Sequence, residues 1–179
     1  MSEVAVSKSD GRLSDKLGVV IAAIRIGFGC VWLLDALLKF NPSFYTGMLG
    51  IVKAADSDGP GWLDGWYNFW FSFLGSAPHV FAVLVMILEC FIAAALLFGF
   101  SRKAVYAIGI VFSFLLWGVG EGFGRLNVSG TTDPNAAVIY IFPFLLLYVI
   151  DGVIPGRLAL DNVIERQIGW WSSVSRRKD

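Results

Sequence analysis

Residues 17–40 read LGVVIAAIRIGFGCVWLLDALLKF, an apolar stretch long enough to cross a lipid bilayer. About 20 mostly apolar residues, at 1.5 Å per residue, match a hydrocarbon core of roughly 30 Å. Arg25 interrupts this stretch, and a charge at such a depth requires a protein partner or a wet cavity. On a helical wheel Lys39 lies within about 40° of Arg25, and Asp35 lies one turn before Lys39. The stretch therefore predicts a membrane span with one polar face.

The composition of the whole chain is typical of a membrane protein. Of the 179 residues, 56% are hydrophobic and 16% are charged, whereas a soluble domain carries about 25% charged residues. The net charge is zero, so nothing in the composition predicts a nucleic-acid partner. Three further apolar runs, at about 79–100, 104–120 and 133–150, predict an all-α, integral membrane four-helix bundle surrounded by membrane lipid.

The connection between the first two predicted spans, residues 43–78, is too long for a simple turn and too polar in its middle to cross a membrane. Aromatic residues recur in it at helical spacing, which predicts an extracytoplasmic amphipathic helical segment of one or two short helices. These residues are Trp62, Trp66, Phe69, Trp70 and Phe73. They either cap the bundle or form one wall of a site for a lipid-soluble ligand.

The sequence divides into three regions by its polarity. Residues 1–16 predict a short, frayed cytoplasmic tail, and residues 17–154 the four-span membrane domain. Residues 155–179 predict an amphipathic cytoplasmic tail, because apolar residues recur there at helical spacing before a basic end. These apolar residues are Leu160, Ile164, Ile168 and Trp171.

Lysine and arginine residues are distributed unevenly between the two predicted sides of the membrane. With both termini cytoplasmic, ten of them lie on the cytoplasmic side and three, Lys39, Lys53 and Arg125, on the outer side. Such a bias predicts a multi-pass protein of the plasma membrane with cytoplasmic termini. The first apolar run lacks a cleavage site, so we expect an uncleaved span.

Two charged residues lie inside predicted spans and are expected to form a pair. Counted from the cytoplasmic ends of their helices, Arg25 lies about 12 Å deep and Glu89 about 15 to 17 Å deep. A long arginine side chain can bridge this offset, and an unpaired charge at that depth is costly. An Arg25–Glu89 pair would either fix the register of two helices or line a polar pocket for a quinone head group, an ion or a proton path.

A second group of charged residues is predicted at the outer face. It comprises Asp35, Lys39, Glu121 and Arg125, with Asp133 and His79 as further members. In one interpretation, these opposite charges at helix ends pair with one another at the membrane interface. In the functional alternative, Glu121 and Lys39 bind a ligand at the mouth of the bundle.

The chain offers few residues for metal or thiol chemistry. His79 is the only histidine and has no cysteine or carboxylate at ligand spacing, so no haem or metal site is expected. Cys30 and Cys90 both fall inside predicted spans. A disulfide between them is possible by depth, but we interpret both as small buried hydrophobic side chains.

Several motifs of the chain resemble those of the DoxX/DoxD-like membrane proteins. The first span has an arginine followed by glycines and a lysine, at Arg25, Gly27, Gly29 and Lys39. The second has a glutamate within LECFIAAALLFG (88–99), and WGVGEGFG (117–124) precedes GTTDPNAAVIY (130–140). The resemblance covers roughly residues 17–152 and is more specific to the DoxD branch.

The resemblance implies a four-helix membrane bundle. For the DoxD branch it also implies the large subunit of a thiosulfate:quinone oxidoreductase with a small second subunit, DoxA. No catalytic residue follows from it. Our own candidates for a quinone pocket are Arg25, Glu89, Lys39 and Glu121, with Asp35, Trp66, Trp70 and Arg125 in support.

Two other functions remain open from the sequence. The chain could be a non-enzymatic accessory, assembly or anchor subunit of a respiratory or redox membrane complex, since a family transfers its fold more reliably than its reaction. It could also be a small proton-coupled transporter that uses its buried charges.

Overall fold

The computed structural model describes the chain except for residues 1, 58–60, 124–135, 152, 155–157 and 176–179. The described residues form helices and turns, with no strand among them. The helices are α1 (Ser2–Leu38), α2 (Pro42–Ser57), α3 (Asp64–Gly75), α4 (Pro78–Phe98), α5 (Arg102–Leu115), α6 (Ala136–Ile150), α7 (Asp161–Ile164) and α8 (Ser172–Ser175). A 3-10 turn at Gly61–Leu63 precedes α3, a π-helix at Leu116–Gly120 extends α5, and a 3-10 turn at Gly169–Trp171 precedes α8.

Three described helices are long and apolar enough to cross a membrane. They are Ser14–Leu38, Pro78–Phe98 and Arg102–Gly120, the last combining α5 with the π-helix. The helix at Ala137–Ile150 is equally apolar in character but shorter. Its predicted start, Asp133 followed by Pro134, lies outside the described residues, and the helix runs through Pro143 without interruption.

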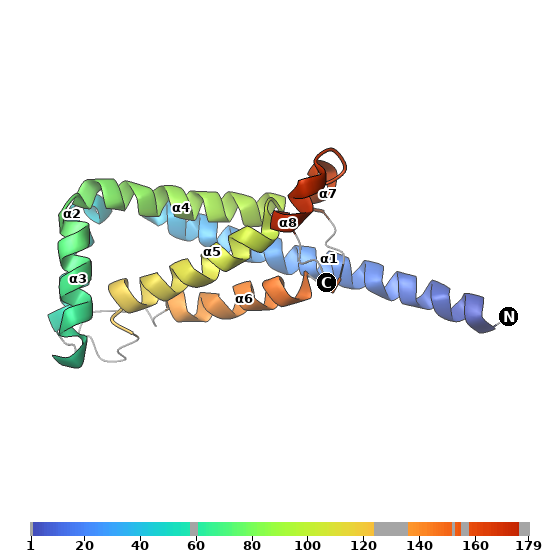
Figure 1. The fold of residues 1–179 in the computed structure, drawn as a ribbon, viewed down its shortest axis with the longest axis horizontal. Coiled ribbons are helices and arrows are strands. Elements are labelled where there is room, and N and C mark those ends of the chain that lie inside the picture. Colours follow the sequence, from blue (N-terminus) through green and yellow to red (C-terminus); the bar gives the residue numbers. More distant parts are fainter. Residues whose placement is uncertain (1, 58–60, 124–135, 152, 155–157, 176–179) are drawn as a thin grey trace.

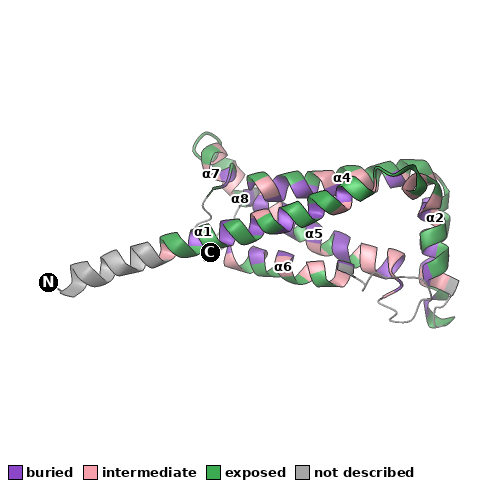
Figure 2. Ribbon diagram, turned by 180° about the vertical axis from the view of Figure 1, so that it is seen from behind, coloured by how far each residue is buried: buried purple, intermediate pink, exposed green. Residues whose placement is uncertain are grey.

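The four long helices lie alongside one another (Figure 1). Helix α1 packs along α4, α5 packs along α6, and the two pairs join through α4 with α5 and α1 with α6. Buried residues face inward between them (Figure 2), and the core they form includes the fully buried Trp32, Ile92, Leu96 and Phe144. The outward faces of the same helices carry many exposed leucine, isoleucine, valine and phenylalanine side chains.

Two glycines allow the helix pairs to approach closely. A Cβ atom on Gly29 of α1 would lie 3.0 Å from the Cβ of Leu96 and from the backbone nitrogen of Leu97, so α1 and α4 touch almost backbone to backbone there. A Cβ atom on Gly109 of α5 would lie 2.3 Å from the ring of Phe144 in α6. These contacts fix the register within each pair.

The Gly109→Ala substitution is expected to lower the free energy of unfolding by about 1–3 kcal/mol, the usual cost of overpacking a core. The ring of Phe144 has little room to move, because it packs against Phe28 and Trp32 at centroid distances of 4.8 and 5.4 Å. The added methyl group therefore outweighs the gain of about 1 kcal/mol in helix propensity. Thermal unfolding in mild detergent measures the change.

Gly27→Ala is the matched control for Gly109→Ala, because nothing lies within 4 Å of a Cβ atom at Gly27. It should leave the midpoint of unfolding unchanged or raise it. Equal stability of the two variants would contradict the close α5–α6 packing.

Helices α2 and α3 lie across one end of the four long helices (Figure 1). A second core joins them to the start of α4 and to the π-helix, and it consists of Met48, Val52, Ala55, Leu63, Tyr67, Leu74, Ala82 and Val119. The prediction that residues 43–78 contain short helices is confirmed. Their aromatic side chains do not share one environment, however, since Trp66 and Trp70 are partly buried and Trp62 is 81% exposed.

The predictions for both ends of the chain are wrong in their local structure. The predicted frayed tail is helical, because α1 already begins at Ser2. The predicted single helix near the C-terminus ends at Ile164, and Ile168 has an extended backbone with φ −125° and ψ 98°. The chain turns back there because the indole nitrogen of Trp171 donates to Asp161 at 2.8 Å, whereas a straight helix would separate these residues by about 15 Å.

Candidate functional site

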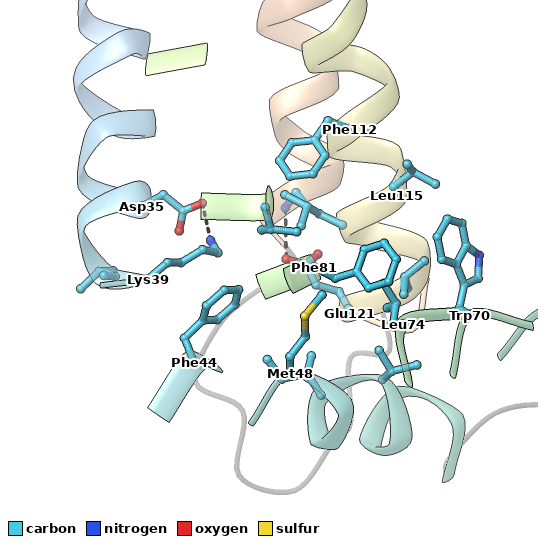
Figure 3. A pocket seen from close by; sticks show the side chains of 18 of the residues that line it. Asp35, Lys39, Phe44, Met48, Trp70, Leu74, Phe81, Phe112, Leu115 and Glu121 are labelled. Carbon is cyan, nitrogen blue, oxygen red and sulfur yellow. Dashed lines mark hydrogen bonds and ion pairs between the residues drawn. The ribbon is translucent and has the colours of Figure 1, made fainter. Parts of the chain in front are cut away.

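A cavity of about 700 Å³ lies where α2 and α3 meet the four long helices (Figure 3). We call it the α2/α3 cavity. Most of its walls are apolar, with contributions from Val31, Leu34, Leu38, Phe44, Met48, Ile51, Val52, Phe73, Leu74, Phe81, Val85, Phe112, Leu115, Leu116, Val119 and Ala137. The more polar lining residues are Asp35, Lys39, Trp70, Glu121 and Tyr140. Such a cavity, apolar with a few polar groups, is typical of a site for a small amphipathic ligand.

Lys39 is the cation of this cavity and is held by two carboxylates. Its Nζ lies 2.9 Å from Oε1 of Glu89 and 3.2 Å from Oδ2 of Asp35. The Glu89 side chain is completely buried, whereas the Lys39 side chain is 17% exposed and lines the cavity. Asp35 lies one helical turn before Lys39 and shares its face. The ammonium group therefore connects a buried carboxylate to the cavity wall.

Glu121 reaches the cavity from the end of the π-helix. The backbone nitrogen of Glu121 still donates to the carbonyl oxygen of Leu116, and Gly122 after it adopts φ +59°. Oε1 of Glu121 accepts a hydrogen bond of 3.3 Å from the backbone nitrogen of Ala137, in the first turn of α6 (Figure 3). A carboxylate suits this place because the first amide groups of a helix have no partner within the helix.

The tryptophans proposed as a lid occupy different places at the cavity. Trp70 lines it together with Phe73 and Leu74 of the same helix. Trp66 is not a lining residue, but its ring packs 5.6 Å from that of Trp70, and its indole nitrogen donates to the carbonyl oxygen of Gly118 at 3.2 Å. Trp66 thus attaches α3 to the π-helix and supports the wall from behind.

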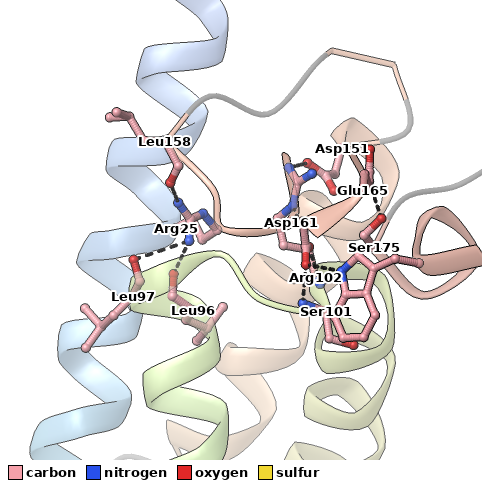
Figure 4. Close-up of polar contacts among 11 residues, drawn as sticks. Arg25, Leu96, Leu97, Ser101, Arg102, Asp151, Leu158, Asp161, Glu165 and Ser175 are labelled. Carbon is pink, nitrogen blue, oxygen red and sulfur yellow. Dashed lines mark hydrogen bonds and ion pairs between the residues drawn. The ribbon is translucent and has the colours of Figure 1, made fainter. Parts of the chain in front are cut away.

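The predicted Arg25–Glu89 pair is wrong. The guanidinium of Arg25 donates instead to three carbonyl oxygens, those of Leu96, Leu97 (3.4 Å) and Leu158 (2.7 Å), as Figure 4 shows. Leu96 and Leu97 belong to the last turn of α4, where carbonyl groups have no partner within the helix. Arg25 is a buried cap for α4 and a link to the C-terminal segment, and it lies outside the α2/α3 cavity.

The C-terminal segment and the α4–α5 turn meet in a buried ionic group that the sequence analysis did not single out (Figure 4). We call it the Arg102 cluster. Arg102 donates from Nη1 to Asp151 at 2.5 Å and from Nε to Asp161 at 3.1 Å, and all three side chains are at least 95% buried. Asp161 also accepts from the backbone nitrogens of Ser101 (2.7 Å) and Arg102 (3.0 Å), and so caps the start of α5 from a distance.

A sequence signal for the Arg102 cluster does exist. Asp151 directly follows the last apolar run, and Asp161 follows ten residues later, on the same predicted side as the basic turn at residues 101–103. Arg102 and Lys103 of this turn entered only the prediction of which side of the membrane the turn lies on. Matching carboxylates with cations just beyond the spans would have suggested the contact.

The remaining predicted site residues do not join the cavity. Arg125 and Asp133 lie outside the described residues, and His79 is exposed in the first turn of α4. Cys30 is exposed and Cys90 half-buried, and both are free thiols. Within the described part of the chain, no group of three His, Cys, Asp or Glu side chains is arranged to hold a metal ion.

The cavity therefore gathers Asp35, Lys39, Glu121 and Trp70, with Glu89 directly behind Lys39. Comparison with known proteins adds no assignment: no protein-family model matches the chain, and neither a curated protein nor a solved structure matches it.

Proposed function

We propose that the chain is a multi-pass protein of the plasma membrane, in which α1, α4, α5 and α6 form a four-span bundle with cytoplasmic termini. Three of these helices are long and apolar enough to cross a membrane, and α6 is apolar throughout. The exposed apolar side chains on their outer faces suit lipid, and the ten-to-three bias of Lys and Arg supports the orientation. In this orientation the α2/α3 cavity opens near the extracytoplasmic surface.

We infer that the α2/α3 cavity binds a quinone and that the protein is the membrane subunit of a quinone-linked redox system. The observation that carries this proposal is that Lys39, paired with the buried Glu89 behind it, lines an apolar cavity of about 700 Å³. A quinone has an apolar ring and two carbonyl oxygens, so it needs apolar walls and a hydrogen-bond donor, and the cavity offers both.

Each polar residue of the cavity has a role in this proposal. Lys39 donates a hydrogen bond to a carbonyl oxygen of the head group, and its charge favours electron density on that oxygen. Glu89 and Asp35 hold the ammonium group in position. Glu121 accepts a hydrogen bond from a hydroxyl group of the reduced ligand. The bound quinone supplies the redox chemistry.

The resemblance to the DoxD branch extends the proposal to an electron donor and a partner. Thiosulfate is then the electron donor, the quinone is the acceptor, and the partner is a second subunit of the DoxA kind.

The first experiment is to purify the protein in mild detergent, extract it and quantify quinone by mass spectrometry, and to add thiosulfate to membranes while quinone reduction is followed. The proposal expects bound quinone in stoichiometric amount and thiosulfate-dependent reduction. A folded protein that contains no quinone and copurifies with another subunit would support an accessory role instead. Proton or solute flux in liposomes, lost on substitution of Glu89, would support a transporter.

The Gly120→Leu substitution should reduce the quinone content at least tenfold. Gly120 lines the cavity, and a Cβ atom there meets only Ile51, at 3.9 Å, so the helix tolerates a side chain that then fills the cavity. Gly50→Leu on α2 is the matched control, because Gly50 is exposed, does not line the cavity and has nothing within 4 Å of its Cβ position. Quinone retained in Gly120→Leu at the level of Gly50→Leu would contradict binding in this cavity.

A further inference from the structure

An apolar groove follows the seam between α4 and α5. It encloses a volume of about 360 Å³ and is lined by Leu88 of α4 and by Ala107, Ile108, Val111, Phe112 and Leu115 of α5. Phe112 and Leu115 also line the α2/α3 cavity. The two spaces therefore share a wall made of these two side chains.

The groove lies next to the cavity along the seam. On α4, Phe81 and Val85 line the cavity and Leu88 lines the groove, and their spacing of four and three residues keeps them on one helix face. On α5 the groove extends from Leu115 back to Ala107, about 12 Å along the helix axis. Figure 1 shows α4 and α5 separating from their common turn toward the end where α2 and α3 lie.

The groove is chemically different from the cavity. None of its lining side chains carries a polar group, whereas the cavity contains an ammonium group and two carboxylates. Ile108 and Val111 are exposed, so in the proposed membrane the groove opens toward the hydrocarbon core. Residues of α2 and α3 line the opposite end of the cavity. The seam is thus a side on which a ligand in the cavity reaches hydrocarbon.

We propose that this groove holds the hydrocarbon tail of the ligand whose head group occupies the α2/α3 cavity, so that the site selects a long-tailed quinone over the bare head group. The inference rests on the proposed quinone-binding function and names the substrate class of that site. A tail in the groove still faces lipid on one side, so binding removes only part of its apolar surface from the lipid. The favourable free energy of tail binding therefore comes from packing against Ala107, Ile108 and Val111.

The test compares two quinones that share a head group, one with a tail of several isoprenoid units and one without. Both are titrated into the purified protein in lipid nanodiscs. Ala107→Trp fills the groove and should weaken binding of the long-tailed quinone about tenfold, while it leaves binding of the tail-free quinone unchanged. Ala94→Trp is the control, because Ala94 is exposed on α4 and lines neither space. The affinities of the variants are compared for the same quinone, so the partition of that quinone into the lipid is the same in each measurement and cancels.

The outcomes separate the two proposals. If neither quinone binds to the unaltered protein, the proposed function fails. If both quinones bind but Ala107→Trp and Ala94→Trp affect the long-tailed one equally, or if Ala107→Trp weakens both ligands alike, the groove does not hold the tail and the inference is overturned. Ala107→Leu places a smaller group in the groove and provides the same comparison, with a smaller loss, if the tryptophan prevents folding.

Discussion

Replacing Arg102 by methionine is expected to lower the free energy of unfolding by about 3–5 kcal/mol, the usual effect of removing one partner from a buried ionic group. Asp151 and Asp161 would then lose the cation that they share. Among the described residues, the fully buried Asp161 would keep the Ser101 and Arg102 amides and Trp171 as donors. Thermal unfolding in detergent measures the loss of stability.

The same substitution should release the C-terminal segment from α5. Arg166 lies in that segment and is exposed, so limited proteolysis with trypsin should cleave after it sooner in Arg102→Met than in the unaltered chain. Arg102→Lys should recover only part of the stability, because an ammonium group cannot serve two carboxylates in the planar geometry of a guanidinium.

Lys103→Met is the matched control, since it removes the neighbouring cation. The only hydrogen bond that the described residues show for Lys103 is an exposed contact of 3.3 Å with the carbonyl oxygen of Ser173. Exposed contacts of this kind contribute about 0–1 kcal/mol. Equal effects of Lys103→Met and Arg102→Met would mean that the Arg102 cluster does not hold the segment in place.

Replacing Lys39 by methionine is expected to destabilise the protein by about 3 kcal/mol and to abolish quinone binding. Among the described residues Lys39 is the cation that pairs with Glu89, and the Glu89 side chain is completely buried. Glu89→Gln should cost less, because Lys39 keeps its contact of 3.2 Å with Asp35. The asymmetry between the two partners is measurable by thermal unfolding.

The double substitution Lys39→Met with Glu89→Gln completes the cycle. It leaves no buried carboxylate without its cation, since the Asp35 side chain that also loses Lys39 is 31% exposed, so it should recover most of the stability lost in Lys39→Met while quinone binding stays absent. Lys53→Met, an exposed lysine on α2, controls for the loss of one positive charge. Additive effects of the two single substitutions would show that Lys39 and Glu89 do not interact.

Periodicity and apolar length were sufficient to locate the helical segments between the two end regions of this chain. Residues 17–38, the helix after residue 78 and the helical character of residues 43–78 follow directly from them. The C-terminal region was mispredicted for a physical reason: Trp171 contacts Asp161, and no local pattern encodes a contact that bends the chain back on itself.

The partner of Arg25 could not be obtained from depth alone. The depths of Arg25 and Glu89 were counted from Leu17 and Phe100, which assumes that these two residues lie at the same level in the membrane. Gly29 packs directly on Leu96 and Leu97, however, and so sets a different register between the two helices. Arg25 lies about 6 Å from that contact in one direction along the helix axis, and Glu89 about 10 Å in the other. Lys39 follows, by about one helical turn, the α1 residues that lie level with Glu89. Its side chain therefore reaches Glu89, whereas that of Arg25 does not.

The structure brings four of the eight candidate and supporting residues together, and most of the apolar lining was not among the candidates. Lys39, Glu121, Asp35 and Trp70 meet at one cavity, as their common outer position suggested. Most of the apolar wall from α2 was missed, although Phe44, Met48 and Val52 recur at helical spacing. These side chains become a wall only because α2 lies across the end of the long helices.

The contacts of Arg25 and Arg102 also bear on the order in which the protein is made. Leu158 and Asp161, which these arginines bind, leave the ribosome after α1, α4, α5 and α6. Until then both cations lack partners that they have in the finished fold, and the start of α5 lacks its capping carboxylate. In the proposed membrane, assembly of the helices would thus be completed from the C-terminal side, and a chain shortened before Asp161 would present quality-control proteases with helices that lack these buried contacts.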